Sequence, residues 1–146
     1  MTAYPADLLA RAAHIRLACF DVDGTLVRFT EGLRRHLEPD AFDLDAYHRA
    51  TVSEAPVAKS VVVLLQALQA ADVAIVISTY RERLYREDTM RLFDRLNIWP
   101  KRTYMRLAED RELTNVAVKA KHLDRIAESY EIIGMADDDP AIEALC

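Results

Sequence analysis

The sequence predicts an α/β fold in which a central parallel sheet lies between two layers of helices. Two observations lead to this prediction. Short apolar runs of strand length alternate with longer segments whose apolar residues recur at helical spacing, a pattern typical of parallel strands joined by crossover helices. Small polar or acidic residues directly follow three of these apolar runs, and ligands of such sheets bind at the carboxyl ends of the strands.

The first apolar run, residues 15–20, contains one polar side chain, Arg16, and is predicted to be a buried strand. Residues 1–14 precede it as a short helix or lead-in. Residues 27–54 are the least periodic part of the chain, which predicts a flap or loop region that covers the site, with His36 and His48 as surface residues.

The second apolar run, residues 73–77, is β-branched and reads as another buried strand. The segment before it, residues 56–71, is predicted to be a helix because its apolar residues fall at positions i, i+3, i+4 and i+7. The remaining predicted elements are a helix at 82–96, a strand at 103–106, a charged loop at 107–112, a helix capped by Thr114 or Asn115, a strand at 130–136 and a short helix opened by Asp139 and Pro140.

Composition limits the possible classes of protein. The chain has 146 residues, 51% hydrophobic and 29% charged, which predicts one soluble domain over residues 1–146. A net charge of -5 argues weakly against a broad nucleic-acid clamp. No signal peptide or membrane span is present, and Cys19 and Cys146 do not suggest a disulfide framework, so a cytoplasmic protein is expected. With three glycines, the chain has no Gly-rich nucleotide loop.

The residues after the first strand carry the most chemistry. Asp21 and Asp23 lie two positions apart, so both side chains point to one side of an extended backbone, and Gly24 frees the turn that follows. Two carboxylates this close repel unless a cation joins them or one takes a proton. Either outcome suits a Mg²⁺ site with a nucleophile and a general acid/base, although an Asp-x-Asp-Gly alone is as typical of a simple turn.

Further polar residues are predicted to converge on the same edge of the sheet. Taken singly, each has an ordinary structural explanation as a turn, a solvated helix face or a helix N-terminus. Taken together, they supply a phosphomonoester with a metal site, cationic and hydroxyl donors, and an in-line nucleophile. These residues are Asp21 and Asp23, Ser78 and Thr79, Asp137 and Asp138, and Lys119 or Lys121.

The run from the first strand through Asp21, Asp23, Gly24 and Thr25 to Leu26 resembles motif one of the haloacid dehalogenase (HAD) superfamily. The resemblance implies a three-layer α/β/α Rossmann-like fold, here without a large cap domain. It also implies that Asp21 is the nucleophile that becomes an aspartyl-phosphate and that Asp23 is the acid/base, which favours a phosphatase over a dehalogenase. The later motifs match Thr79, Lys119 (with Lys121 as the alternative), and the pair Asp137 and Asp138.

A closer resemblance is to the 3'-phosphatase domain of phage polynucleotide kinase–phosphatase. It rests on Thr79-x-Arg81-Glu82, Tyr104-Met105-Arg106, Asp110-Arg111 and Val118-Lys119. It implies that Arg81 and Arg106 contact the substrate, and that a further strand follows the last helix, so that this chain is a truncated or minimal version. Tyr80 stands where the family has glycine, and Asp139 where it has arginine, which leaves the polynucleotide substrate open.

The resemblance and the residues together predict a Mg²⁺-dependent phosphomonoester hydrolase for nucleic-acid 3' ends. The alternatives are a phosphatase for small nucleotides or other phosphometabolites, and a non-catalytic accessory domain of the same fold. The expected catalytic residues are Asp21, Asp23, Thr79 and Lys119; the substrate-binding residues are Gly24, Thr25, Ser78, Arg81 and Arg106; the metal ligands are Asp21, Asp23, Asp137 and Asp138.

Overall fold

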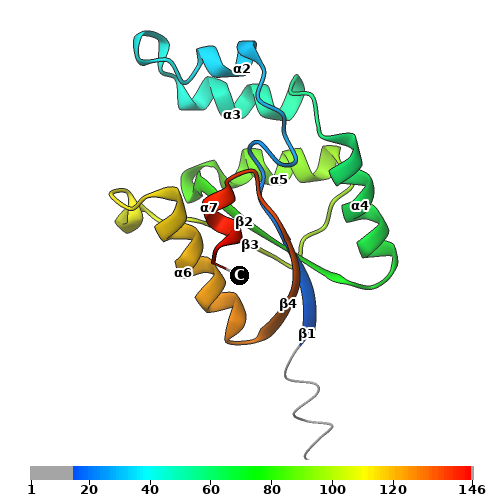
Figure 1. The fold of residues 1–146 in the computed structure, drawn as a ribbon. Helices are drawn as coiled ribbons and strands as arrows, with labels where there is room; N and C mark the ends of the chain where they lie inside the picture. Colours follow the sequence, from blue (N-terminus) through cyan, green and yellow to red (C-terminus); the bar gives the residue numbers. More distant parts are fainter. Residues whose placement is uncertain (1–14, 146) are drawn as a thin grey trace, which may run out of the picture.

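The computed structural model describes residues 15–145, and its centre is a four-stranded parallel sheet in the order β3-β2-β1-β4 (Figure 1). The expected lead-in at residues 1–14 and Cys146 lie outside the described residues. The strands are β1 (Ile15–Phe20), β2 (Ala74–Glu82), β3 (Arg102–Arg106) and β4 (Tyr130–Ala136), and the longer helices are α3 (Leu44–Ser53), α4 (Lys59–Ala70), α5 (Arg86–Arg95) and α6 (Asn115–Ala127).

The alternation of side chains along β1 builds a hydrophobic core on each face of the sheet. Ala18 and Phe20 belong to the larger core, which also contains buried residues of α4 and α5. Leu17 and Cys19 belong to the smaller core with Leu123 and Ile126 of α6. Figure 1 shows α6 on one side of the sheet and α4 on the other. The predicted three-layer fold with a parallel sheet is therefore confirmed.

Several predicted boundaries shift by a few residues. β2 continues past the apolar run to Glu82, because Glu82 still pairs with Arg106 of β3 beyond an irregularity in the register. α5 consequently begins at Arg86, after the 3₁₀ turn η2 (Arg83–Tyr85), instead of at residue 82. α6 begins after Thr114, whose side chain accepts a hydrogen bond from the backbone N–H of Ala117, and Asp139 caps α7 (Pro140–Glu143) as expected.

The segment 27–54 is more regular than the predicted flap or loop. It holds α2 (Glu31–Arg35), the 3₁₀ turn η1 (Pro39–Ala41) and α3, with side-chain caps at Thr30 and Asp43. Figure 1 shows α2 and α3 as a small layer beyond the carboxyl end of the sheet, and α3 packs against α5. We call this segment the helical flap. Within residues 15–145, no helix has the length and apolar character needed to cross a membrane.

His122 of α6 is a buried histidine whose titration should couple stability to pH. Its Nδ1 lies 2.9 Å from the Ser78 hydroxyl, and burial lowers its pKa from 6.5 to about 4. The unfolded chain therefore binds a proton near pH 6.5 that the folded chain takes up only near pH 4. The stability contributed by the neutral ring is present above pH 6.5 and is lost as the pH falls through this window.

Replacing His122 with glutamine should therefore weaken the pH dependence of the free energy of unfolding. We expect the free energy of unfolding of His122→Gln to fall less steeply than that of wild type between pH 6.5 and 4, by about 1.4 kcal/mol per pH unit. Urea titrations at several pH values measure the slope, with His36→Gln at the flap as the control. Equal slopes for wild type and His122→Gln would contradict the lowered pKa of His122 in the folded chain.

Candidate active site

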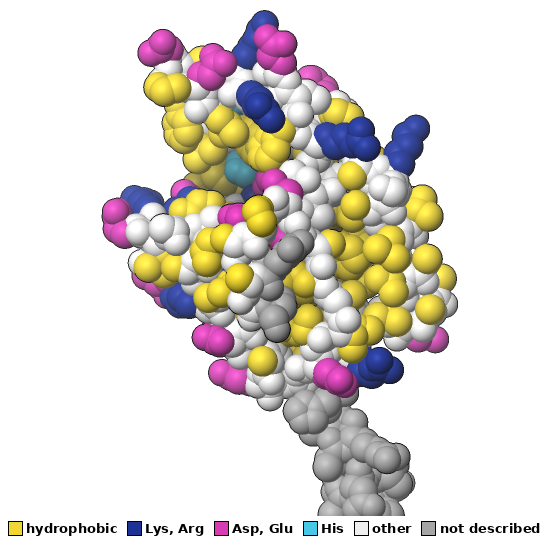
Figure 2. Space-filling model, viewed as in Figure 1, with side chains coloured by type: hydrophobic (Ala, Val, Ile, Leu, Met, Phe, Trp, Pro, Cys, Tyr) yellow, Lys and Arg dark blue, Asp and Glu magenta, His cyan; other side chains and the backbone are white. Residues whose placement is uncertain are grey.

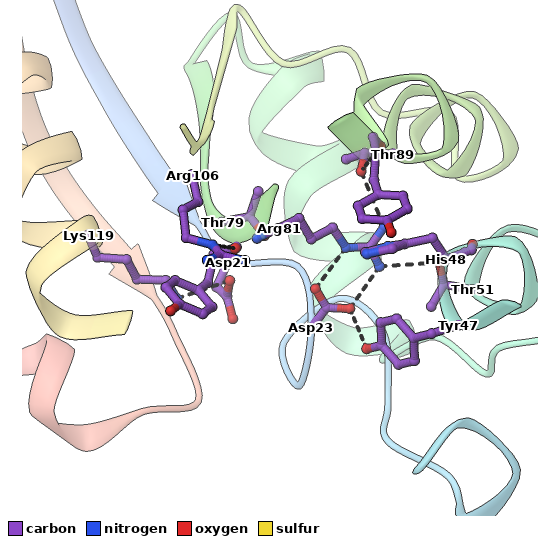
Figure 3. A network of polar contacts seen from close by, with 12 residues as sticks. Asp21, Asp23, Tyr47, His48, Thr51, Thr79, Arg81, Thr89, Arg106 and Lys119 are labelled. Carbon is purple, nitrogen blue, oxygen red and sulfur yellow. Dashed lines mark hydrogen bonds and ion pairs between the residues drawn. The ribbon is translucent and has the colours of Figure 1, made fainter. Parts of the chain in front are cut away.

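Carboxylates at the ends of two neighbouring strands, β1 and β4, meet the ammonium group of one lysine. Asp21 directly follows β1 and Asp137 directly follows β4, and the neighbouring strands place both at one edge of the sheet. Lys119 reaches this edge from the first turns of α6. Its Nζ lies 3.0 Å from Asp21 Oδ1, and it also donates a hydrogen bond to Asp137. The lysine side chain is 1% exposed, so its ammonium group is shielded from water. Figure 3 shows Lys119 reaching toward Asp21.

The burial of this cluster perturbs the ionisation of its members. Burial raises the pKa of Asp21 to about 7, against the attraction of the Lys119 ammonium, while Asp137 acts in the same direction as burial. Burial opposes the charge on Lys119, yet Asp21 and Asp137 together raise the pKa of this lysine. The lysine is therefore a firmly held cation, and Asp21 is a carboxylate whose charge depends on its cationic neighbours.

The second carboxylate of the motif, Asp23, has a separate set of partners. The guanidinium of Arg81 donates two hydrogen bonds of 2.7 Å, one to each oxygen of Asp23. The hydroxyl of Tyr47, from α3, donates a third of 2.7 Å. Although burial alone would raise the pKa of Asp23, Arg81 and then Tyr47 hold it below its usual range. Figure 3 shows Asp23 turned toward these partners.

Arg81 is anchored on the side away from Asp23 as well. Its guanidinium nitrogens lie 3.2 Å from Thr51 Oγ1 and 3.3 Å from Thr89 Oγ1, and its side chain is 1% exposed. The sequence predicted a substrate contact for Arg81, but the structure commits its guanidinium to Asp23 and two threonines. These contacts orient Asp23 and leave little of the arginine surface free for a substrate.

The sequence did not predict that the helical flap contributes residues to the contacts around Asp23 and Arg81. Tyr47 and Thr51 lie four positions apart on α3, on the face that meets the body of the domain, and both are buried. His48 between them is also buried and stacks on Tyr85, with ring centroids 3.9 Å apart. A polar stripe at helical spacing within residues 44–53 was the available signal, and the interpretation of this region as a loop concealed it.

Three carboxylates could hold a divalent metal ion. Oxygen atoms of Asp21, Asp137 and Asp138 all lie within 4.8 Å of one another. Gly24 permits the approach of Asp138, because a Cβ at this position would lie 2.1 Å from Asp138 Oδ2, and its φ of +85° suits glycine. An all-oxygen donor set of this kind fits Mg²⁺. The side chain of Asp23, which we also predicted as a ligand, is not part of this group.

The small polar residues predicted for the site lie deeper than expected. The hydroxyl of Ser78 contacts His122 of α6, and Ser78 does not line the cavity between the helical flap and the sheet. The hydroxyl of Thr79 is buried and accepts a hydrogen bond of 3.3 Å from the backbone N–H of Arg81. The hydroxyl of Thr25 is buried and has no hydrogen-bond partner among the described residues. A buried hydroxyl beside Asp21 and Gly24 in sequence is thus available as a donor.

A cavity of about 700 Å³ opens between the helical flap and the carboxyl end of the sheet, and we call it the catalytic cleft. Asp21, Asp23, Lys119 and Asp138 lie in its lining. Figure 2 shows the hollow beneath the flap, with hydrophobic side chains on its walls and acidic side chains where it meets the body of the domain. The aromatic and apolar side chains of the lining are Phe29, Leu37, Phe42, Leu44, Tyr47, Tyr80 and Tyr85.

Tyr80 and Arg106 form a pair at the edge of the catalytic cleft. The Arg106 guanidinium lies 4.4 Å from the centre of the Tyr80 ring, and it forms an ion pair of 2.6 Å with Glu82. The Tyr80 hydroxyl donates a hydrogen bond of 2.8 Å to the carbonyl of Leu113. Tyr80, which stands in place of the expected glycine, is therefore a fixed aromatic surface in the cleft lining.

The two lysines that the sequence left open as alternatives lie in different surroundings. Lys119 is buried between Asp21 and Asp137, whereas the side chain of Lys121 is 53% exposed and pairs with Asp110. Lys121 belongs to another cavity and does not line the catalytic cleft. The placement therefore favours Lys119 over Lys121 as the lysine of the candidate active site.

Alanine substitutions of these lysines should give different results. If Asp21 is the nucleophile that the sequence predicts, we expect Lys119→Ala to lower kcat for phosphate release by about 10²–10³-fold, because it removes the cation beside Asp21. Lys121→Ala should stay within about twofold of wild type, since exposed ion pairs contribute little. Steady-state kinetics on one phosphomonoester compares the two variants directly. A larger loss for Lys121→Ala would contradict the assignment.

Residues 16–143 match the family model described as the polynucleotide kinase PNKP phosphatase domain. The chain belongs to this family. The match covers nearly the whole described chain and includes the pair Asp21 and Asp23 and the pair Asp137 and Asp138. The domain is therefore a HAD-type phosphatase, as the sequence motifs predicted. No curated protein matches the chain as a whole.

Solved structures show the same fold. A chain of the Pnkp1/Rnl/Hen1 RNA repair complex aligns with a TM-score of 0.70 and 20% identity, over 90% of this chain and 39% of that one. The class C acid phosphatase from Bacillus anthracis with tungstate bound aligns with a TM-score of 0.73 and 12% identity, over 94% of this chain and 57% of that one. The chain thus spans less than two thirds of each of these structures.

Proposed function

We propose that this domain hydrolyses phosphomonoesters at nucleic-acid 3' ends, with Mg²⁺ and through an aspartyl-phosphate on Asp21. The observation that supports this most strongly is the separation of the two carboxylates into different environments. Asp21 lies beside Lys119 and the other acidic ligands, and Asp23 is bound by Arg81 and Tyr47. Two carboxylates with divergent environments suit the two roles of nucleophile and acid/base.

In the first step, an oxygen of Asp21 attacks phosphorus, and the bond from phosphorus to the leaving oxygen breaks. Asp23 in its protonated form gives its proton to that oxygen, and a hydroxyl of the substrate leaves. Lys119 compensates the negative charge on the phosphoryl oxygens. The buried hydroxyls of Thr25, which follows Asp23 by two positions, and of Thr79, which lies on β2 near Arg81, serve as further donors.

In the second step, water attacks phosphorus, Asp23 takes the proton of that water, and the bond from phosphorus to Asp21 breaks. Inorganic phosphate leaves, and Asp21 and Asp23 return to their initial states. The three hydrogen bonds that Asp23 accepts favour its carboxylate form, which this step requires. They also make its protonated form, which the proton of the water restores, a stronger acid for the first step. Arg81 and Tyr47 act as positioning residues, because they fix the orientation of the base.

Asp21, Asp137 and Asp138 would hold the metal ion, because their oxygen atoms lie within 4.8 Å of one another. A bound Mg²⁺ supplies positive charge that neutralises carboxylates and phosphoryl oxygens. Gly24 keeps the space that Asp138 needs to join this group.

The lining of the catalytic cleft supports a substrate that carries a nucleobase. Phe29, Phe42 and Tyr80 offer aromatic surface beside the carboxylates, and bases stack on such side chains. The size of the cleft also favours a second candidate, a phosphatase for free nucleotides, because a cavity of about 700 Å³ under the flap has room for a single nucleotide.

Phosphate release separates these candidates. The assay compares a 3'-phosphorylated oligonucleotide, a nucleoside 3'-monophosphate and an aryl phosphate, each with Mg²⁺ and with chelator. We expect release from all three that chelator stops, with the highest kcat/KM for the oligonucleotide. Equal or faster turnover of the mononucleotide would move the assignment to small nucleotides. No release from any substrate would contradict the catalytic proposal and favour an accessory domain.

A further inference from the structure

A second cavity, of about 840 Å³, lies outside the catalytic cleft and carries an excess of positive charge. Its lining contains six lysines and arginines and three acidic residues, in a chain whose net charge is -5. We call it the basic groove. Its cations are Arg83 from η2, Arg86 from the start of α5, Lys101 just before β3, Arg102 at the start of β3, and Lys121 and Arg125 from α6.

Most of these cations are free to bind a ligand. Among the described residues, Arg83, Arg86, Arg102 and Arg125 are exposed and have no acidic partner within 4.0 Å. Only Lys121 forms an ion pair, with Asp110. Unpaired arginines that face a common groove create a local positive potential despite the acidic chain, and such a potential attracts polyanions.

Protection of an exposed sheet edge does not account for this arrangement. β3 is an edge strand, and charged side chains on edges prevent unwanted strand pairing. That purpose explains Lys101 and Arg102 on the strand itself. It does not explain cations on α5 and α6 that converge on the same groove.

The basic groove adjoins the catalytic cleft. Glu82 and Arg106 line the cleft, and the residues that follow them, Arg83 and Leu107, line the groove. From Arg106 the groove follows β3 back to Arg102, about 13 Å at ~3.3 Å per residue. This length corresponds to about four stacked nucleotides at ~3.4 Å each.

We propose that the basic groove binds the sugar-phosphate backbone of a single strand whose 3' end occupies the catalytic cleft. This inference rests on the proposed polynucleotide substrate and extends it with a path for the nucleotides before the terminal one. Contacts to phosphates are independent of sequence, so the groove would contribute affinity and orientation without base preference. Tyr104, which also lies in the groove, offers a ring for stacking.

Charge reversal in the basic groove tests the proposal. The variant Arg102→Glu/Arg125→Glu changes two exposed residues away from the carboxylates, and Arg35→Glu/Arg49→Glu on the helical flap is the control with the same change in charge. The probe for binding is a fluorescent single strand of about ten nucleotides with a 3'-hydroxyl, more than twice the length of the groove. Its anisotropy is measured as a function of salt, which needs no catalytic activity.

We expect the groove variant to bind this strand at least about tenfold more weakly than wild type, with a shallower salt dependence. The KM for a 3'-phosphorylated strand should rise similarly, while kcat/KM for a nucleoside 3'-monophosphate stays within about twofold. The control variant should bind like wild type. Unchanged binding by the groove variant, or an equal loss in the control, would overturn the proposal even if phosphate release from every substrate were normal.

Discussion

Asp21→Asn should lower phosphate release from every substrate by about four orders of magnitude or more, because the amide cannot form the acyl-phosphate bond. The fold should survive, since Lys119 keeps its contact with Asp137 and the substitution removes a charge that burial disfavours. Kinetics on an aryl phosphate measures the loss, and thermal unfolding checks the fold. The exposed Asp94→Asn on α5 is the matched control.

Residual activity of Asp21→Asn within about tenfold of wild type would contradict the role of this residue as nucleophile. A comparable loss in Asp94→Asn would show that the effect arises from preparation or folding and not from the site.

Arg81→Met should have the largest effect on stability among substitutions near the site. Arg81 donates two hydrogen bonds to Asp23 at 2.7 Å and is 1% exposed. Its removal leaves the Asp23 carboxylate, whose side chain is 20% exposed, without its cation; breaking a buried pair in this way typically costs about 3–5 kcal/mol, and the partial exposure of Asp23 places the loss at the lower end. The pKa of Asp23 should then rise, because burial is no longer opposed by the guanidinium. Urea unfolding at neutral pH measures the loss in free energy.

A second substitution separates the unpaired charge from the lost packing. In Arg81→Met/Asp23→Asn the buried carboxylate is gone, so most of the stability should return while phosphate release stays low. If the double variant is as unstable as Arg81→Met, the loss comes from the packing of the arginine side chain with Thr51 and Thr89, and the explanation through Asp23 is wrong.

The parts of the fold that carry strong local patterns could be predicted from the sequence. The apolar run at residues 15–20 is β1, and the segment that Asp139 and Pro140 open is α7. The convergence of Asp21, Asp137 and Lys119 followed from the rule that parallel strands end at one edge of a sheet. These inferences needed only periodicity, capping residues and topology.

The parts that depend on tertiary contacts could not be predicted in this way. The guanidinium of Arg81 contacts Asp23, which lies 58 positions earlier in the chain, and nothing local to either residue indicates that pairing. Ser78 lies next to Thr79 on β2, yet the alternation of side chains directs its hydroxyl to His122 of α6. The hydrogen bond from Tyr47 to Asp23 depends on the docking of α3 against α5. The weak periodicity of residues 27–54 did not reveal that docking.

The most direct test of the central claim is to trap the phosphoryl group on the protein. Asp23→Asn should form the intermediate from an aryl phosphate, whose leaving group needs little protonation, and should hydrolyse it slowly for want of a base. After rapid quenching, mass spectrometry of the peptides should locate the phosphoryl group on Asp21. Release of phosphate without a phosphorylated protein, or a phosphoryl group on another residue, would contradict the mechanism.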